Sequence, residues 1–121
     1  KMLTAKPLIT GRNAEQHALK LLNRSGLRLL VRNFRCRSGE LDLVMLDGHD
    51  LVIVEVRYRA RRNYGHAAET VNRSKQGRII SATKQFLSRN PQHATRAVRF
   101  DVVALHGDAE PEWLKDAFQA D

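Results

Sequence analysis

Two apolar runs in the middle of the chain predict a pair of strands. Residues 40–46 and 51–58 are mostly apolar, and both runs have the length of a buried strand. The four residues between them, 47–50, contain a glycine flanked by polar residues and are typical of a hairpin turn. The sequence therefore predicts an antiparallel hairpin.

Helical spacing of apolar residues precedes and follows this hairpin. Apolar residues three or four positions apart predict a first helix over about residues 10–25, with Thr10 as its cap and Gly26 as its stop. A second helix is predicted over residues 72–89, and Asn90-Pro91 ends it. The predicted inner side of the second helix consists of Ile79, Ile80, Thr83, Phe86 and Leu87.

Two further strands complete the predicted order of elements. Residues 27–35 form a moderately apolar run before the hairpin, and residues 97–105 form a stronger one after the second helix. A helix before the last strand provides a crossover, so this strand can lie parallel to one hairpin arm. The predicted fold is α/β, with an α-β-β-β-α-β core over about residues 10–106 and a mixed sheet flanked by helices.

Length and composition favour one globular domain over residues 1–121, because the chain is 42 % hydrophobic and 28 % charged. The acidic tail, residues 107–121, is predicted to pack on the core through Trp113, Leu114 and Phe118. No apolar run is long enough for a membrane span, and no signal peptide is evident. Cys36 is the only cysteine, which excludes an intrachain disulfide and favours the cytoplasm.

The charge of the chain is strongly positive and unevenly distributed. The formal net charge is +8. Residues 57–89 hold nine Lys or Arg and one acid, whereas residues 106–121 hold five acids and one Lys. This asymmetry predicts a positive surface, for which nucleic acid is the commonest ligand. The alternative is that the charge serves solubility alone.

Acidic residues interrupt the apolar hairpin strands. A turn centred on residues 48–49 pairs Asp42 with Glu55 on one face of the hairpin. The same register places Glu40 opposite Arg57. Like charges directly opposed destabilise a sheet, and a divalent cation such as Mg²⁺ would explain the pair. The alternative is an ion-pair cluster in which Arg57 and neighbouring arginines neutralise both acids.

Four blocks of sequence, in order and covering about residues 11–118, carry a resemblance to a known family. They read GRNAEQHALKLLNRSG, LLVRNFRCRSGELDLVMLDGHDLVIVEVRYR, ETVNRSKQGRIISATKQFL and RFDVVAL. These blocks resemble the YraN-like family of uncharacterised bacterial proteins. That family is similar to restriction-endonuclease-like proteins near the Holliday-junction resolvases. The resemblance implies a restriction-endonuclease-like fold and a metal-dependent endonuclease that acts on structured or branched DNA.

The resemblance also implies a metal site for Mg²⁺ or Mn²⁺. The superfamily places an acid on the second strand and Asp/Glu-x-Lys on the third, which implies Asp42 and Glu55 as metal ligands. Glu15 matches the helix acid of resolvase-like members and is the implied third ligand, although alone it is equally an ordinary solvated acid. Arg57 stands where the family usually has lysine. Arginine suits phosphate oxygens but cannot act as a base.

Basic residues after the proposed metal strand are predicted to bind the nucleic-acid backbone. These residues are Arg59, Arg61, Arg62 and Lys75. The expected partner is DNA, and a homodimer is implied by analogy with resolvases. One alternative is a non-catalytic nucleic-acid-binding module with a degenerate metal site, and another is a basic scaffold that binds an acidic protein. The histidines show no ligand spacing and are predicted to lie at the surface or in turns: His17, His49, His66, His93 and His106.

Overall fold

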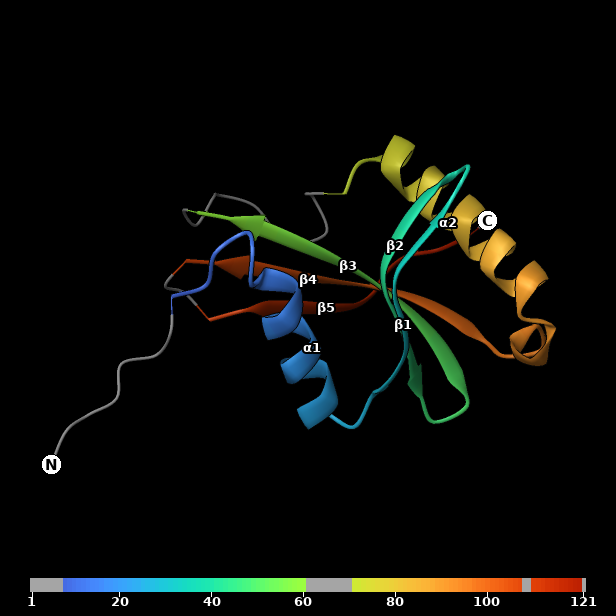
Figure 1. Ribbon diagram of the computed structural model, residues 1–121, viewed down its shortest axis with the longest axis horizontal. Coiled ribbons are helices and arrows are strands. Elements are labelled where there is room, and N and C mark those ends of the chain that lie inside the picture. Colours follow the sequence, from blue (N-terminus) through green and yellow to red (C-terminus); the bar gives the residue numbers. More distant parts are fainter. Residues whose placement is uncertain (1–7, 61–70, 108–109, 121) are drawn as a thin grey trace, which may run out of the picture.

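The computed structural model describes residues 8–60, 71–107 and 110–120. Within them, five strands form one sheet in the order β1-β2-β3-β4-β5 (Figure 1). The elements are α1 (Ala14–Arg24), β1 (Arg28–Cys36), β2 (Gly39–Asp47), β3 (Asp50–Arg59), α2 (Arg73–Arg89), the 3-10 turn η2 (Pro91–His93), β4 (Val98–His106) and β5 (Glu112–Phe118). No helix in this part of the chain has the length and apolar character that a membrane crossing requires.

The sheet is mixed, as predicted. Strands β1, β2 and β3 pair antiparallel, β4 lies parallel to β3, and β5 returns antiparallel to β4. Helix α2 provides the crossover between the two parallel strands. The α/β fold with α-β-β-β-α-β order is confirmed, and the packed tail element is a fifth strand.

The two helices cover opposite faces of the sheet, because side chains alternate along each strand. Val44 and Ile53 belong to the core cluster that includes Phe86 of α2. Their strand neighbours, such as Val54, belong to the cluster that includes Leu22 of α1. Residues with the parity of Ile53 on β3 therefore face α2.

The hairpin register follows the prediction. Leu46 pairs with Leu51, and a two-residue turn joins β2 to β3. Gly48 has a φ of +61°, a left-handed conformation that glycine adopts without steric cost.

The two helix starts differ from each other in how they are capped. Asn72 accepts a hydrogen bond from the backbone N–H of Lys75 at 2.8 Å, as expected for an N-cap. Helix α1 begins later than predicted, with Asn13 at its N-cap position. Asn13 accepts from the Thr10 N–H at 2.7 Å and donates its own N–H to the Thr10 hydroxyl, which closes a turn ahead of the helix.

Candidate metal-binding site

Asp42 and Glu55 meet where the hairpin strands begin to part. The β2–β3 ladder extends as far as Leu43 and Val54, and beyond this pair the two strands diverge (Figure 1). The Asp42 carboxylate accepts a hydrogen bond from the Val56 N–H at 2.9 Å, in place of a ladder bond. The Glu55 carboxyl group lies close enough for its charge to act directly on Asp42. The structure thus brings the two predicted acids together on the face that α2 covers.

The electrostatics of this pair are unfavourable. Glu55 is only 4 % exposed. Burial and, after it, the neighbouring Glu55 charge raise the pKa of Asp42 from its ordinary value of 3.8 to about 7, against opposing effects of the Val56 N–H and the Lys75 charge. At neutral pH the pair is therefore partly protonated, whereas two solvated carboxyl groups would both be ionised.

Lys75 is the principal cationic partner of the acid pair. Its Nζ lies 2.6 Å from Oε2 of Glu55, an oxygen that has no aligned hydrogen bond from any described residue. Arg57 approaches the same oxygen only to 4.0 Å. The Asn72 cap fixes the first turn of α2, from which the Lys75 side chain reaches the sheet.

Glu15 lies apart from the acid pair in the structure. One of its oxygens, Oε1, accepts hydrogen bonds from Arg32 at 2.9 Å and from the Asn33 side chain at 3.1 Å. Asn33 lies on β1 opposite Asp42, because the residues on either side of Asn33 pair with the residues on either side of Asp42. The φ of Asn33 is +54°. Glu15 is therefore tied to the residue opposite Asp42. Among the residues that the structure describes, however, no three His, Cys, Asp or Glu side chains form a metal-binding group.

Comparison with known proteins places this arrangement in a family. Residues 14–105 match the family described as Uncharacterised protein family UPF0102. The chain is 48 % identical to a UPF0102 protein of Pseudomonas entomophila, over 98 % of this chain and 99 % of that protein. It is 43 % identical to one of Alcanivorax borkumensis, over 93 % of each.

The chain belongs to the UPF0102 family. This confirms the resemblance to YraN-like proteins that the four sequence blocks carry. A third relative, a UPF0102 protein of Stutzerimonas stutzeri, is 48 % identical over 92 % of this chain and 95 % of its own length.

One predicted ion pair of this UPF0102 protein is wrong. Glu40 was expected opposite Arg57, but it pairs with Arg35 on β1, whose Nε donates to the Glu40 carboxylate at 3.0 Å. The reason is the divergence of β2 from β3 beyond Leu43, which leaves the start of β2 paired with β1 alone.

The predicted nucleic-acid contacts are only partly within the described residues. Arg59 ends β3 and is half-buried, while Arg61 and Arg62 lie outside the described residues, as does His66. His106 corrects the expectation of a surface or turn histidine, because it ends β4 and is only 6 % exposed. Its position at the end of an apolar run was the signal in the sequence.

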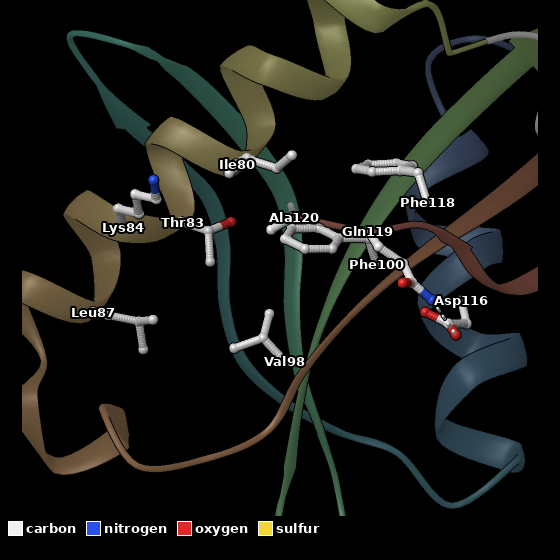
Figure 2. A pocket seen from close by; sticks show the side chains of 10 residues that line it. All are labelled: Ile80, Thr83, Lys84, Leu87, Val98, Phe100, Asp116, Phe118, Gln119 and Ala120. Carbon is white, nitrogen blue, oxygen red and sulfur yellow. Dashed lines mark hydrogen bonds between the residues drawn. The ribbon is translucent and has the colours of Figure 1, made fainter.

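A cavity in the described part of the protein lies away from the acids. It has a volume of about 500 Å³ between α2, β4 and β5 (Figure 2). Its lining is Ile80, Thr83, Lys84, Leu87, Val98, Phe100, Asp116, Phe118, Gln119 and Ala120. Neither acid of the pair contributes to this lining. The candidate chemistry lies instead at the fork, the place beyond Leu43 and Val54 where β2 and β3 diverge.

Proposed function

We propose that this UPF0102 protein is a metal-dependent endonuclease that acts on structured or branched DNA. The observation that carries this proposal is the pairing of half-buried Asp42 with buried Glu55, with the Lys75 ammonium 2.6 Å from Glu55. Among the described residues the two acids have one close cation, and acids that lack full neutralisation are characteristic of sites that receive another positive group.

The residues at the fork fit Mg²⁺ or Mn²⁺. Two neighbouring carboxyl groups match the one or two carboxylates that typically hold Mg²⁺, and a bound cation would offset the repulsion from the Glu55 charge that helps to raise the pKa of Asp42. Asp42 and Glu55 would hold the ion, and Glu15 stays a predicted third ligand that Arg32 neutralises at present. When bound, such an ion activates water and neutralises charge on the phosphoryl oxygens.

Lys75 and Arg57 divide the work that a single motif lysine would do. Lys75 places an ammonium beside Glu55, where it can donate to a phosphate oxygen or orient an attacking water. Arg57 lies on the same face, and its weak contact with Glu55 leaves the guanidinium able to hold a phosphate through two parallel bonds. The arginine at position 57 therefore does not remove the amine from the site.

The proposal extends to the partner and the assembly. Arg59, Arg61 and Arg62 continue the chain from β3 and would contact the DNA backbone without reading sequence. We place the activity in the cytoplasm, since Cys36 is the only cysteine. A homodimer would allow symmetric cutting of two strands, and light scattering of the purified protein measures it.

A cleavage assay tests the proposal. Labelled four-way junctions and duplexes are incubated with Mg²⁺, Mn²⁺ or chelator and with wild type, Asp42→Asn, Glu55→Gln or Glu40→Gln. Glu40 is the matched control because its carboxylate pairs with Arg35 at the surface. We expect metal-dependent cleavage that falls at least about a hundredfold in the two site variants and is unchanged in the control.

A second readout is independent of activity. Mn²⁺ should raise the unfolding temperature of wild type and Glu40→Gln but not of Asp42→Asn or Glu55→Gln, because only a ligand of the folded state stabilises it. An equal thermal response in all four proteins would contradict a metal site at the fork.

One observation favours a second function, a non-catalytic nucleic-acid-binding module. The contact between Lys75 and Glu55 is already a close ion pair, as a degenerate site would have. This alternative predicts DNA binding that chelator does not change and no cleavage with either metal.

A further inference from the structure

The ends of the two parallel strands bring an arginine and a histidine together. Arg59 is the register partner of His106 in the β3–β4 ladder. Side chains an even number of residues apart on a strand lie on the same face. Arg59 therefore shares the α2-facing side of β3 with Glu55, and His106 shares that side of β4 with Ala104. The two side chains therefore lie side by side on the face that carries the acid pair.

The backbone beyond these residues is tightly held. A Cβ at Gly107 would come within 3.2 Å of the Ala60 carbonyl oxygen, so the two strands leave no room for a side chain there. The Gly107 carbonyl also accepts a hydrogen bond from the Ile9 N–H at 3.1 Å. These contacts fix the spacing of Arg59 and His106.

Neither side chain has satisfied its inner nitrogen. Nε of Arg59 and Nδ1 of His106 are buried and have no hydrogen-bond partner among the residues that the structure describes, where Glu55 Oε2 alone shares this condition. Buried polar atoms without partners are rare and unfavourable in native proteins. His106 is 94 % shielded from solvent, so bulk water does not relieve it.

The same two residue types solve this problem elsewhere in the fold. Nε of Arg96 donates to Nδ1 of His93 at 2.9 Å, and both nitrogens are satisfied. Arg59 and His106 are neighbours yet make no such bond. An oxygen with more than one lone pair could accept from the Arg59 guanidinium and from the imidazole together.

We propose that Arg59 and His106 form a phosphate-binding subsite for the nucleic-acid backbone, beside the acid pair on the α2 face. Arg59 is half-buried at a strand end, so part of its side chain is accessible to a phosphate from solvent. Four residues of strand separate Arg59 from Glu55, or roughly 13 Å. That distance spans at most about four nucleotides along one strand of a duplex.

The subsite rests on the nucleic-acid part of the proposed function and is independent of cleavage. Binding of a labelled duplex and a four-way junction is measured in chelator over a series of salt concentrations. Arg59→Gln should weaken binding about tenfold and reduce the log–log salt slope by about 1. Arg28→Gln is the matched control, because Arg28 is exposed and pairs with Leu46 at the far end of the sheet.

Nitrogen NMR of the imidazoles follows His106 directly and avoids substitution of a buried side chain. Addition of duplex DNA, or of inorganic phosphate, should shift the ring nitrogens of His106 in wild type and not in Arg59→Gln. The ring of His93 is the internal control, since its Nδ1 already accepts a hydrogen bond from Arg96.

The outcomes separate this subsite from the nuclease proposal. Arg59→Gln behaving like Arg28→Gln, or an unmoved His106 resonance while DNA binds, would overturn the subsite even if the protein cleaves. Both expected responses without any cleavage would support the subsite and overturn the nuclease instead.

Discussion

Two sites in this fold bury carboxylates, and they differ in how completely the charges are neutralised. Asp101 on β4 is fully buried, and its two oxygens accept four hydrogen bonds, at 2.9–3.2 Å, from Arg99, Trp113 and the Asp116 N–H. The fork between β2 and β3 offers Glu55 one ammonium at 2.6 Å and Asp42 one backbone N–H at 2.9 Å, while the acids face each other.

The difference teaches that burial of an acid does not by itself indicate function. Asp101 is a structural acid that links β4 to β5, because donors of the protein itself satisfy its two oxygens. The pair of Asp42 and Glu55 has fewer donors from the described residues, which costs stability unless another positive group neutralises the charges. The contrast can be tested by comparing what each acid does for stability and for activity.

The largest effect is expected from Asp101→Ala. It leaves the Trp113 indole N–H and the Asp116 N–H without their acceptor and leaves Arg99 with its ion pair to Asp47 alone. We expect a loss of about 3–5 kcal/mol in the free energy of unfolding, measured with urea. Glu40→Ala is the control, expected to cost less than about 1 kcal/mol because its ion pair is exposed. Similar losses in both variants would remove the distinction.

Asp42→Asn should raise the free energy of unfolding at high pH, whereas Asp101→Ala lowers it. The folded pKa of Asp42 is about 7, above its ordinary value of 3.8, so the folded state binds more protons between these values. The stability of the metal-free wild type should therefore fall as pH rises from about 4 to about 7 and stay reduced above. In chelator at pH 8, Asp42→Asn should be more stable than wild type by about 1–4 kcal/mol.

Urea unfolding of both proteins across this pH range measures the effect. The difference between them should become small near pH 4, where Asp42 of the folded wild type is neutral. A variant that is less stable than wild type at pH 8 would show that the fork is as well satisfied as the Asp101 site.

A smaller effect separates the two basic residues at the fork. Lys75 lies 2.6 Å from Glu55, whereas Arg57 lies 4.0 Å away. If the fork cleaves DNA, Lys75→Gln should lower the cleavage rate about a hundredfold and Arg57→Gln about tenfold, because Lys75 stands nearer the acids. Single-turnover rates at saturating protein make the comparison. Equal losses would mean that the two side chains contribute alike.

Much of the hairpin could be predicted from the sequence. Its turn is short and contains Gly48, so the register of β2 and β3 followed from counting outward, and with it the meeting of Asp42 and Glu55. Helix α2 could also be predicted from the sequence, because Asn72 caps it and the apolar residues recur at helical spacing.

The rest depended on contacts between distant segments. The reach of Lys75 to Glu55 requires α2 to pack over the sheet, and no local pattern encodes that crossing. The Glu40 prediction failed because β2 leaves β3 beyond Leu43 and stays paired with β1. Strand β5 lacks a clean alternation of buried and exposed residues, so its sequence alone did not predict a strand.

The hydrogen bond from the Val56 N–H to Asp42 has a consequence for how variants should be built. This carboxylate acts as a spacer that stands in for backbone between the parting strands. Removing the whole side chain frees the amide of Val56 to seek another acceptor and lets the gap narrow, which would mix a change of shape with a change of charge. An amide side chain keeps an oxygen in place, so asparagine isolates the charge.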